Sequence, residues 1–262
     1  MRRFFAIVKV TLLQLIGRRR SIGLLVLSAV PAVILLLVGL NSTDRETEEF
    51  FRTGLLFIVL GVTVPIISII LGAGSLGDER SAKTLSYLAL RPIRREVIVA
   101  AKLVAAWLAS FAVAGAGALL TAIVLGYTVG SWDEMLAILV ATAITALGFV
   151  AATQLLGYIT DRAVLIALAY LLIWEGVVTG AASQVASTSI WRMGVSAYAG
   201  IVAGDHWGSD AFGLETQVVA DLEDLLSGVL PGVWGAVLKV LGLAAVSVAV
   251  TAYLMRERDL VA

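Results

Sequence analysis

The sequence predicts an all-α integral membrane protein in which six transmembrane helices form a single domain over residues 1–262. Hydrophobic residues make up 60% of the chain and charged residues only 15%, whereas about 25% of the residues in soluble domains are charged. The apolar residues form charge-free runs, and a helix needs about 20 such residues to cross a bilayer. The strands of a membrane β-barrel would instead alternate apolar and polar residues, and no segment of the sequence does so.

Residues 1–20 are expected to form a helix that lies on the cytoplasmic face of the membrane. When this segment is wound as a helix, its apolar side chains share one arc, and they are Phe4, Phe5, Val8, Leu12, Leu15 and Ile16. The basic residues Arg2, Arg3 and Lys9 lie elsewhere, as is typical of an interfacial helix. The alternative is a disordered basic leader.

The first charge-free run, residues 21–40, is expected to be a retained transmembrane helix. A basic leader followed by an apolar run also resembles a secretory signal, but this run is longer than the usual signal core. No small-x-small cleavage site follows it, so we expect the first span to stay in the protein.

Five further runs predict the other spans, and they cover residues 53–77, 103–132, 135–160, 163–174 with an extension past Glu175, and 240–255 with an apolar lead-in. The run at 103–132 is too long for one perpendicular helix and too short for two. We expect a long or tilted helix there, followed by a short exterior segment that contains Gly126 and Gly130.

The distribution of charge orients these spans. Of the 19 Lys and Arg residues, 15 fall on one side of the predicted bilayer, and the exceptions are Arg45, Arg52, Arg192 and Lys239. Basic loops lie in the cytoplasm, so both termini are predicted to be cytoplasmic in a multi-pass protein of the cell membrane. Residues 180–233 then form a long extracytoplasmic segment, in which we expect short exterior helices that dip back into the membrane.

Composition excludes several kinds of chemistry. The chain has no Cys, which rules out disulfides and thiolate metal sites. Its formal net charge of zero gives no general attraction for nucleic acid. Asp205, His206 and Asp210 form the one cluster with metal-ligand chemistry, and because it holds a single His at ordinary loop spacing we expect no metal site.

The cytoplasmic loop at residues 78–96 is the most informative segment. An amphipathic helix fits residues 79–90, because Asp78 and Glu79 suit its N-terminus and Pro92 stops it. Its small apolar face is formed by Ala82, Leu85, Leu88 and Ala89. A helix of this kind has little core of its own to pack against, so it is suited to dock on another molecule. The alternative is a loop helix that rests on the membrane surface.

In this loop the chain resembles the ABC-2 type exporter permeases. Their signature consists of an acidic residue, a Thr-Leu pair, a hydrophobic pair, Pro, an apolar residue, Arg, and Lys at the head of the next span. The corresponding residues here are Glu79, Thr84, Leu85, Leu88, Pro92, Ile93, Arg94 and Lys102. Lys83 departs from the pattern, since the family more often has Gly before the Thr. The resemblance also extends to the layout of the whole chain.

This resemblance implies that the loop holds a coupling helix, which sits in a groove of a separate ATP-hydrolysing subunit. The expected contact residues are Asp78, Glu79, Arg80, Ala82, Thr84, Leu85, Tyr87, Leu88, Arg91, Pro92, Arg94 and Arg95. The complex would contain two ATPase subunits and a second permease copy, or a related permease, surrounded by membrane lipid. The predominantly apolar spans suggest that it exports a hydrophobic or amphipathic molecule.

The sequence independently supports the expectation that ATP is hydrolysed by a separate subunit. A P-loop needs a Gly-Lys pair to surround phosphates, and the sequence contains none. We therefore expect no catalytic residue and no cofactor in this chain, with ATP and Mg bound by the partner. One alternative is a complex that transmits mechanical work to an extracytoplasmic partner without transport. Another is a secondary carrier, which would require paired acidic residues near the middle of the membrane. The sequence contains no such pair.

Two ionisable residues fall within the predicted spans at similar heights. Glu175 lies about 20 Å along a helix from Arg162, and Lys239 about 25 Å from Arg256, at 1.5 Å per residue. Because charges at such depths are costly without partners, we expect Glu175 and Lys239 to be close or to share an exterior-facing cavity. The alternative is snorkelling of both groups to the interface.

Small residues recur at helical spacing along the third span, at Ala106, Ser110, Ala114 and Ala118, with Gly115 and Gly117 beside them. Such a stripe favours close helix packing, and we prefer this reading to a substrate path.

Overall fold

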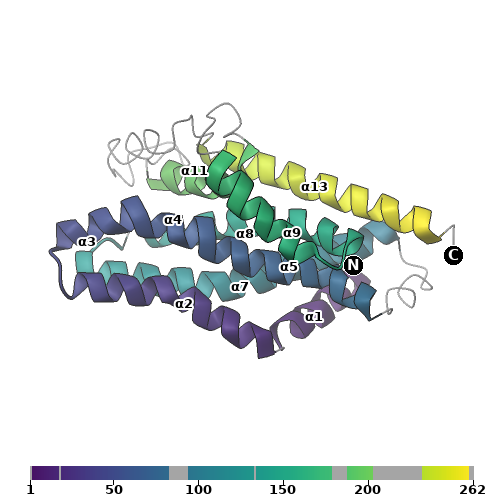
Figure 1. Cartoon of the computed structure of the whole chain (residues 1–262), viewed down its shortest axis with the longest axis horizontal. Coiled ribbons are helices and arrows are strands. Elements are labelled where there is room, and N and C mark those ends of the chain that lie inside the picture. The colour runs from purple at the N-terminus through teal and green to yellow at the C-terminus, as the bar shows by residue number, and fades with distance from the viewer. Residues whose placement is uncertain are drawn as a thin grey trace.

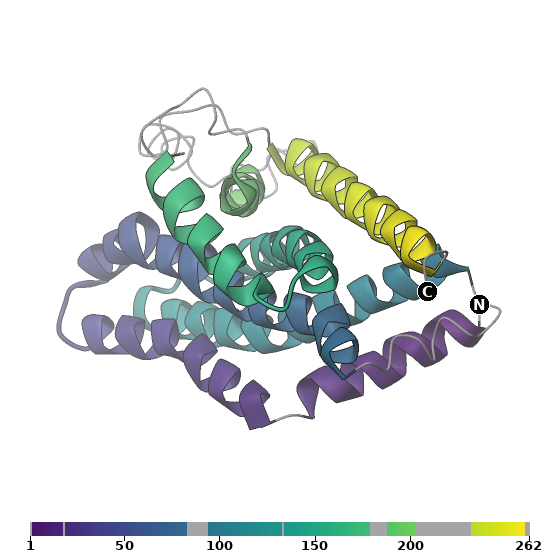
Figure 2. The same cartoon turned by 45° about the vertical axis from the view of Figure 1, so that its right-hand side comes forward.

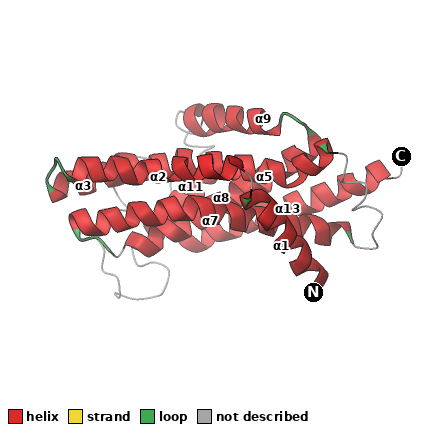
Figure 3. Cartoon of the chain, turned by 90° about the horizontal axis from the view of Figure 1, so that it is seen from below, coloured by secondary structure: helices red, strands yellow, loops and turns green. Residues whose placement is uncertain are grey.

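The computed structural model describes residues 2–17, 19–82, 94–132, 134–178, 188–202 and 232–259. These residues form helices and contain no strand, as Figure 3 shows. The long helices are α2 (Arg19–Gly39), α5 (Val64–Ser81), α7 (Arg95–Val129), α8 (Glu134–Ile159) and α13 (Gly232–Asp259). Figure 1 shows α2, α5 and α7 extending along the long axis of the bundle.

The two ends of the bundle differ in charge. One end carries Arg20, Arg80, Arg95 and Lys102, and we call it the basic end. The N-terminal helix α1 (Arg2–Ile16) and the last turns of α13 lie there (Figure 1). The opposite end, where the short helix α3 (Asp44–Phe50) lies, is called the acidic end. The basic end is the one that the sequence assigns to the cytoplasm.

Helix α1 is present where the sequence predicts it, but it ends at Ile16, and Arg19 and Arg20 belong to α2. Its buried face packs on α7, where Val8 contacts Ala101 and Ala105. Phe5 and Ile16 belong to the predicted apolar arc, yet their side chains are exposed. The reason is that α7 covers only one side of α1.

Five helices are long and apolar enough to cross a membrane, and they are Arg20–Gly39, Leu56–Ser81, Arg95–Val129, Glu134–Ile159 and Gly232–Arg256. The fifth of the six predicted spans is a shorter apolar helix within the described residues, Ala163–Val178. It consists of α9 (Ala163–Tyr170) and the π-helical segment η3 (Leu171–Val178). It packs on α5 and α8 and slopes across one side of the bundle (Figure 2).

The second span belongs to one continuous helical stretch, which begins with α3 and passes through η1 (Phe51–Leu55), α4 (Leu56–Ile58), η2 (Val59–Thr63) and α5. This corrects the predicted start of the loop helix at Glu79, because the helix of the second span continues past that residue. Asp78 to Ser81 form the last turn of α5, and Ala82 is its C-terminal cap. The rest of the predicted loop helix, from Lys83 to Leu90, lies outside the described residues.

Helix α3 starts with a capping box. The Thr43 N–H donates to Glu46 Oε2 at 2.9 Å, and the Glu46 N–H donates to the Thr43 hydroxyl at 3.4 Å. The backbone and hydroxyl of Thr43 hold the pKa of Glu46 below its ordinary value of 4.5. A carboxylate with a lowered folded-state pKa stabilises the fold above its unfolded pKa, and this contribution is lost as the pH falls through the folded-state pKa.

Helix α3 should therefore loosen at its N-terminus on acidification below pH 4.5. A spin label on a single Cys introduced at Arg45 would report this as increased mobility at low pH and not at neutral pH. In Thr43→Val the cap is absent, so the label should be mobile at both pH values. Equal mobility of the label in Thr43→Val and in the parent protein at neutral pH would contradict the cap.

Helix α7 is a single helix of 35 residues and ends at Gly130, whose φ of 85° suits glycine. At 1.5 Å per residue it is about 50 Å long, well beyond the ~30 Å hydrocarbon layer. The long helix is confirmed, but Gly126 lies inside it and not in an exterior segment. Trp132 folds back over Gly126, where a Cβ would lie 2.6 Å from the indole.

Small residues bring the helices close together. A Cβ on Gly117 of α7 would lie 1.9 Å from the Ser28 carbonyl oxygen of α2, and one on Gly157 of α8 would lie 2.3 Å from the Ala73 carbonyl oxygen of α5. Ala106 and Ala114 of the predicted small-residue stripe are buried in the core. Close packing through small residues is how membrane helices associate, and the stripe at 106–118 serves it.

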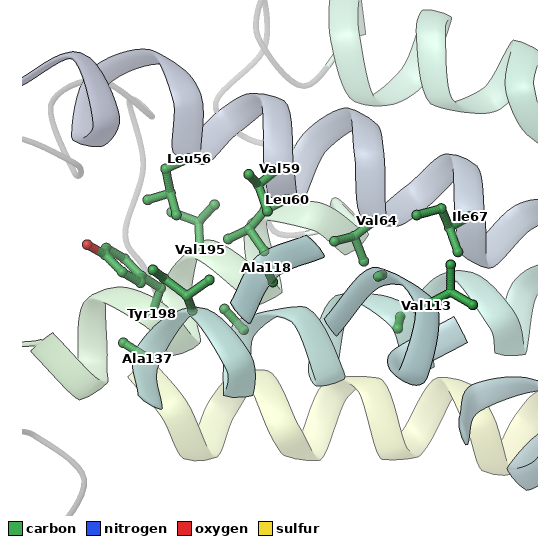
Figure 4. Packing of buried hydrophobic residues seen from close by; sticks show 14 of the residues in the cluster. Leu56, Val59, Leu60, Val64, Ile67, Val113, Ala118, Ala137, Val195 and Tyr198 are labelled. Carbon is green, nitrogen blue, oxygen red and sulfur yellow. The ribbon is translucent and has the colours of Figure 1, made fainter. Parts of the chain in front are cut away.

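Part of the main core lies around α11 (Ile190–Val202), a helix of 13 residues. Figure 4 shows Val195 and Tyr198 of this helix facing Leu56 and Leu60 of the second span. Every α11 residue except Trp191 is buried. The described part of the predicted exterior segment is thus an inner helix, and the segment ends at Gly232, where α13 begins.

Helix α13 is the least buried of the long helices, and Ser247 fixes it to α8 by donating a hydrogen bond to the Ala151 carbonyl oxygen. Hydrogen bonds between membrane helices contribute about 0.6 kcal/mol on average. Ser247→Ala should lower the free energy of unfolding by about that amount, as measured by SDS-induced unfolding. Ala245→Ser, on the exposed face of α13, is the matched control and should have no effect.

Candidate functional site

Three consecutive charged residues at the end of α5 each reach a different part of the bundle. Asp78 Oδ2 lies 2.6 Å from Arg20 Nη2 of α2, and Glu79 Oε1 lies 2.6 Å from Lys102 Nζ of α7. Arg80 lies 3.6 Å from Asp161, which follows α8, and also donates to the Tyr158 carbonyl oxygen at 3.0 Å. The last turn of α5 is therefore a junction for the helices at the basic end.

The Glu79–Lys102 pair is the most buried of these contacts. The Lys102 side chain is 1% exposed, and its ammonium also donates to the Ser75 carbonyl oxygen at 3.1 Å. Glu79 belongs to α5 and Lys102 to α7, the two helices that flank residues 83–93. Both residues are part of the sequence signature, but their spacing of 23 positions in the chain did not show that they pair.

The residues predicted to contact an ATPase fall into two groups. Asp78, Glu79, Arg80 and Ala82 lie at the end of α5, and Arg94 and Arg95 lie at the start of α7. Thr84, Leu85, Tyr87, Leu88, Arg91 and Pro92 lie outside the described residues. The described charged side chains at the end of α5 make ion pairs inside the chain, and one of these, Glu79–Lys102, joins the two helices that flank the loop.

Next to this junction, Glu96 in the first turn of α7 pairs with Arg256 of α13. The pair is largely exposed, so it contributes little to stability. It nevertheless shows that the last turns of α13 lie beside the first turn of α7.

Glu175 occupies a buried polar cluster with the first turn of α11. Its Oε1 accepts hydrogen bonds from the Tyr170 hydroxyl at 3.0 Å and from the Ile190 N–H at 2.8 Å. Its Oε2 accepts one from the Ser189 hydroxyl, and the Arg192 guanidinium interacts with the same carboxylate electrostatically. The carboxylate therefore caps the N-terminus of α11, where negative charge is favourable.

We expected Glu175 and Lys239 to be close or to share an exterior-facing cavity, and in the described part of the chain their side chains differ in exposure. Glu175 is 4% exposed and faces α11, whereas the Lys239 side chain is exposed on the outer surface of α13. Helical rise gives the height of a residue in the membrane but not the direction in which its side chain points. The position of Lys239 agrees with the alternative of snorkelling, and Trp234 is exposed on the same helix.

A second buried cluster lies at the acidic end, and the sequence analysis missed it. Glu134, 1% exposed, accepts from Arg52 Nη2 at 2.8 Å and from the Tyr198 hydroxyl at 2.6 Å. Arg52 also pairs with Glu48 at 2.8 Å. The one available signal was that Arg52 and Glu134 are charged residues beside two apolar runs.

Both clusters join α11 to π-helical segments. Glu175 belongs to η3 and binds the start of α11, and Arg52 belongs to η1 and reaches Tyr198 through Glu134. π-Helical turns shift the side chains that follow them and are frequent at functional sites. The inner helix is thus held at two points, one from each of two spans.

The described residues contain no group of three or more His, Cys, Asp or Glu side chains that could hold a metal ion. Asp205, His206 and Asp210 lie outside the described part of the chain.

Comparison with known proteins identifies the family. A family model described as "ABC-2 family transporter protein" matches residues 16–172, which is more than half of the chain. The match includes the junction at the end of α5, Lys102 and the loop between them. No curated protein matches the chain. The chain therefore belongs to the ABC-2 family of transporter proteins and is a membrane permease subunit of an ABC transporter.

Proposed function

We propose that this chain is the transmembrane subunit of an ATP-driven exporter, in which separate ATPase subunits act on the loop between α5 and α7. The observation that carries the proposal is the buried Glu79–Lys102 ion pair, which joins the two helices on either side of that loop. The absence of a Gly-Lys pair from the sequence leaves ATP and Mg to the partner subunits.

The Glu79–Lys102 ion pair holds together the two helices that flank the loop. Lys102 is held by both Glu79 and the Ser75 carbonyl oxygen, and separating a buried charge from its partner is strongly unfavourable. A displacement of residues 83–93 would therefore move the ends of α5 and α7 together. Arg20 couples α2 to the same point through Asp78.

The second span would carry this movement across the bundle. Residues 44–81 are helical without interruption from the acidic end to the basic end. Arg52 near the start of this stretch is paired with Glu134, which binds Tyr198 of α11. A shift of α5 at the basic end would therefore reach the inner helix at the acidic end. This arrangement supports a mechanism in which ATP-driven closure of the partner subunits moves α11.

The remaining features of the proposal follow from the family and the charge distribution. The complex would contain two ATPase subunits and two permease copies in the cell membrane, with both termini of this chain in the cytoplasm. The chain itself would carry no catalytic residue. The apolar spans favour a hydrophobic or amphipathic cargo.

The test of ATPase docking uses the loop between α5 and α7. The chain has no native Cys, so a single Cys introduced at Leu85 can be cross-linked to Cys variants of the ATPase subunit encoded with it. We expect a cross-link that changes in yield when ATP is added. Leu85→Asp should abolish co-purification with the ATPase, and Leu85→Met is the matched control. A stable complex with normal ATP turnover in Leu85→Asp would contradict the proposal.

A further inference from the structure

Helix α1 has two apolar faces, and only one of them packs on the bundle. Val8, Thr11 and Leu15 are buried, and Val8 contacts Ala101 and Ala105 of α7. Exposed apolar side chains lie on the opposite side of the helix, and they are Phe5, Val10, Leu13 and Ile16. We call these four side chains the outer face of α1. Figure 2 shows that the described helices leave this side of α1 uncovered.

The outer face also carries positive charge. Lys9 is exposed and lies one helical turn from both Phe5 and Leu13, so its side chain shares their side of α1. Residues 1–43 contain six Lys and Arg residues and no Asp or Glu. The segment that forms α1 and leads into α2 is therefore strongly basic.

The described carboxylates at the basic end have other partners. Asp78 pairs with Arg20 and so offsets one of the six charges. Three further carboxylates pair with cations outside residues 1–43, in the pairs Glu79–Lys102, Glu96–Arg256 and Asp161–Arg80. Lys9 makes no ion pair within the described part of the chain, so its charge is available to a ligand.

The position of α1 indicates that the outer face meets lipid. Only two residues separate Ile16, the last residue of α1, from Arg19, the first residue of α2. Helix α2 is a candidate membrane span, and its first turns expose Ile22 and Leu25. The apolar surface of the span thus continues onto α1. Exposed apolar side chains with cations among them suit the boundary between lipid headgroups and acyl chains.

We infer that the outer face of α1 binds the cytoplasmic leaflet of the membrane and selects anionic phospholipids over zwitterionic ones. The apolar side chains would enter the acyl region, while the ammonium of Lys9 extends to the headgroup phosphates. Phosphatidylglycerol has a net negative charge, whereas the choline group of phosphatidylcholine opposes the cations. The opposite face of α1 packs on α7, so bound lipid would hold α1 between the membrane and α7. The inference does not depend on ATPase coupling.

The test places a fluorescent probe on the outer face and measures which lipids reach it. The chain has no native Cys, so a single Cys at the exposed position Val10 can carry the probe. The full-length chain is reconstituted in equal amounts of phosphatidylcholine and phosphatidylglycerol, and one of the two lipids carries a nitroxide quencher. We expect phosphatidylglycerol to quench more strongly. About 1 M salt should remove most of the difference, because it shortens the Debye length to about 3 Å.

Two substitutions then separate charge from apolar contact. Lys9→Gln should lower the preference for phosphatidylglycerol by a factor of up to about five, because each cation near an anionic surface contributes roughly that factor. Leu13→Ala should weaken quenching by both lipids and leave the preference unchanged. Arg45→Gln is the matched control, because Arg45 is an exposed cation of α3 at the acidic end, and its loss should change neither quantity.

Four results would overturn the inference. The first is equal quenching by the two lipids, and the second is weak quenching by both. The third is a preference in Lys9→Gln that equals the preference in Arg45→Gln. The fourth is a loss of quenching when the ATPase subunits are added, which would assign the outer face to a protein partner and not to lipid.

Discussion

Glu79→Gln should lower the free energy of unfolding by about 3–5 kcal/mol, which is the usual effect of removing one partner from a buried ion pair. The reason is that Lys102 is 1% exposed and would keep its charge without an anionic partner. Its ammonium would retain the Ser75 carbonyl oxygen, which cannot neutralise it. Thermal unfolding or SDS-induced unfolding of the purified protein measures the effect.

Two further variants make this experiment specific. Arg80→Gln breaks the adjacent pair with Asp161, which is longer and more exposed, so it should change stability by less than about 1 kcal/mol. In the double variant Glu79→Gln/Lys102→Met neither charge remains, and most of the lost stability should return. If Glu79→Gln were as stable as Arg80→Gln, the buried pair would not hold α5 to α7.

The double variant also separates stability from function. It should fold, but it would lack the buried ion pair that joins α5 to α7 at this level. In a complex with the ATPase, we expect it to transport less cargo for each ATP hydrolysed than the parent protein does. Unchanged transport per ATP would show that the pair has a structural role only.

The sequence predicted the positions of the spans well because charged residues bound the apolar runs. The run at 21–40 corresponds to α2 (Arg19–Gly39), and the run at 135–160 corresponds to α8 (Glu134–Ile159). The end of the second span was placed too early, at residue 77, because the sequence places Asp78 to Arg80 in a polar loop. In the structure their charges are compensated by Arg20, Lys102 and Asp161, so α5 continues to Ser81.

The buried clusters could not be predicted for a different reason. Arg52 and Glu134 are 82 positions apart in the chain, and their contact depends on how the second and fourth spans pack. Glu175 falls in the predicted fifth span, but its contacts with Ser189 and Ile190 at the start of α11 were not predicted. Sequence periodicity fixes neither the rotation of a helix nor the position of a π-turn.

The second large effect on stability is expected at the acidic end, in the buried cluster of Arg52, Glu134 and Tyr198. Arg52→Met should destabilise the protein by about 3–5 kcal/mol, because Glu134 is 1% exposed and would keep only the Tyr198 hydroxyl as a partner. Arg45→Met is the matched control, since Arg45 is an exposed residue of α3 and its loss should have little effect. Adding Glu134→Gln to Arg52→Met removes the remaining charge and should restore much of the stability.

The same substitution should also loosen the inner helix, which a purely local effect on α3 would not do. Ala199 of α11 is 2% exposed, so a single Cys placed there in this Cys-free chain should react slowly with a water-soluble maleimide. Arg52→Met frees Glu134 from its cation and weakens the contact that holds Tyr198, so labelling at position 199 should accelerate. Because Glu175 holds the other end of α11, labelling at Ile190 should change less. If the two positions accelerated equally, or if Arg45→Met had the same effect, Arg52 would not be the residue that connects the second span to α11.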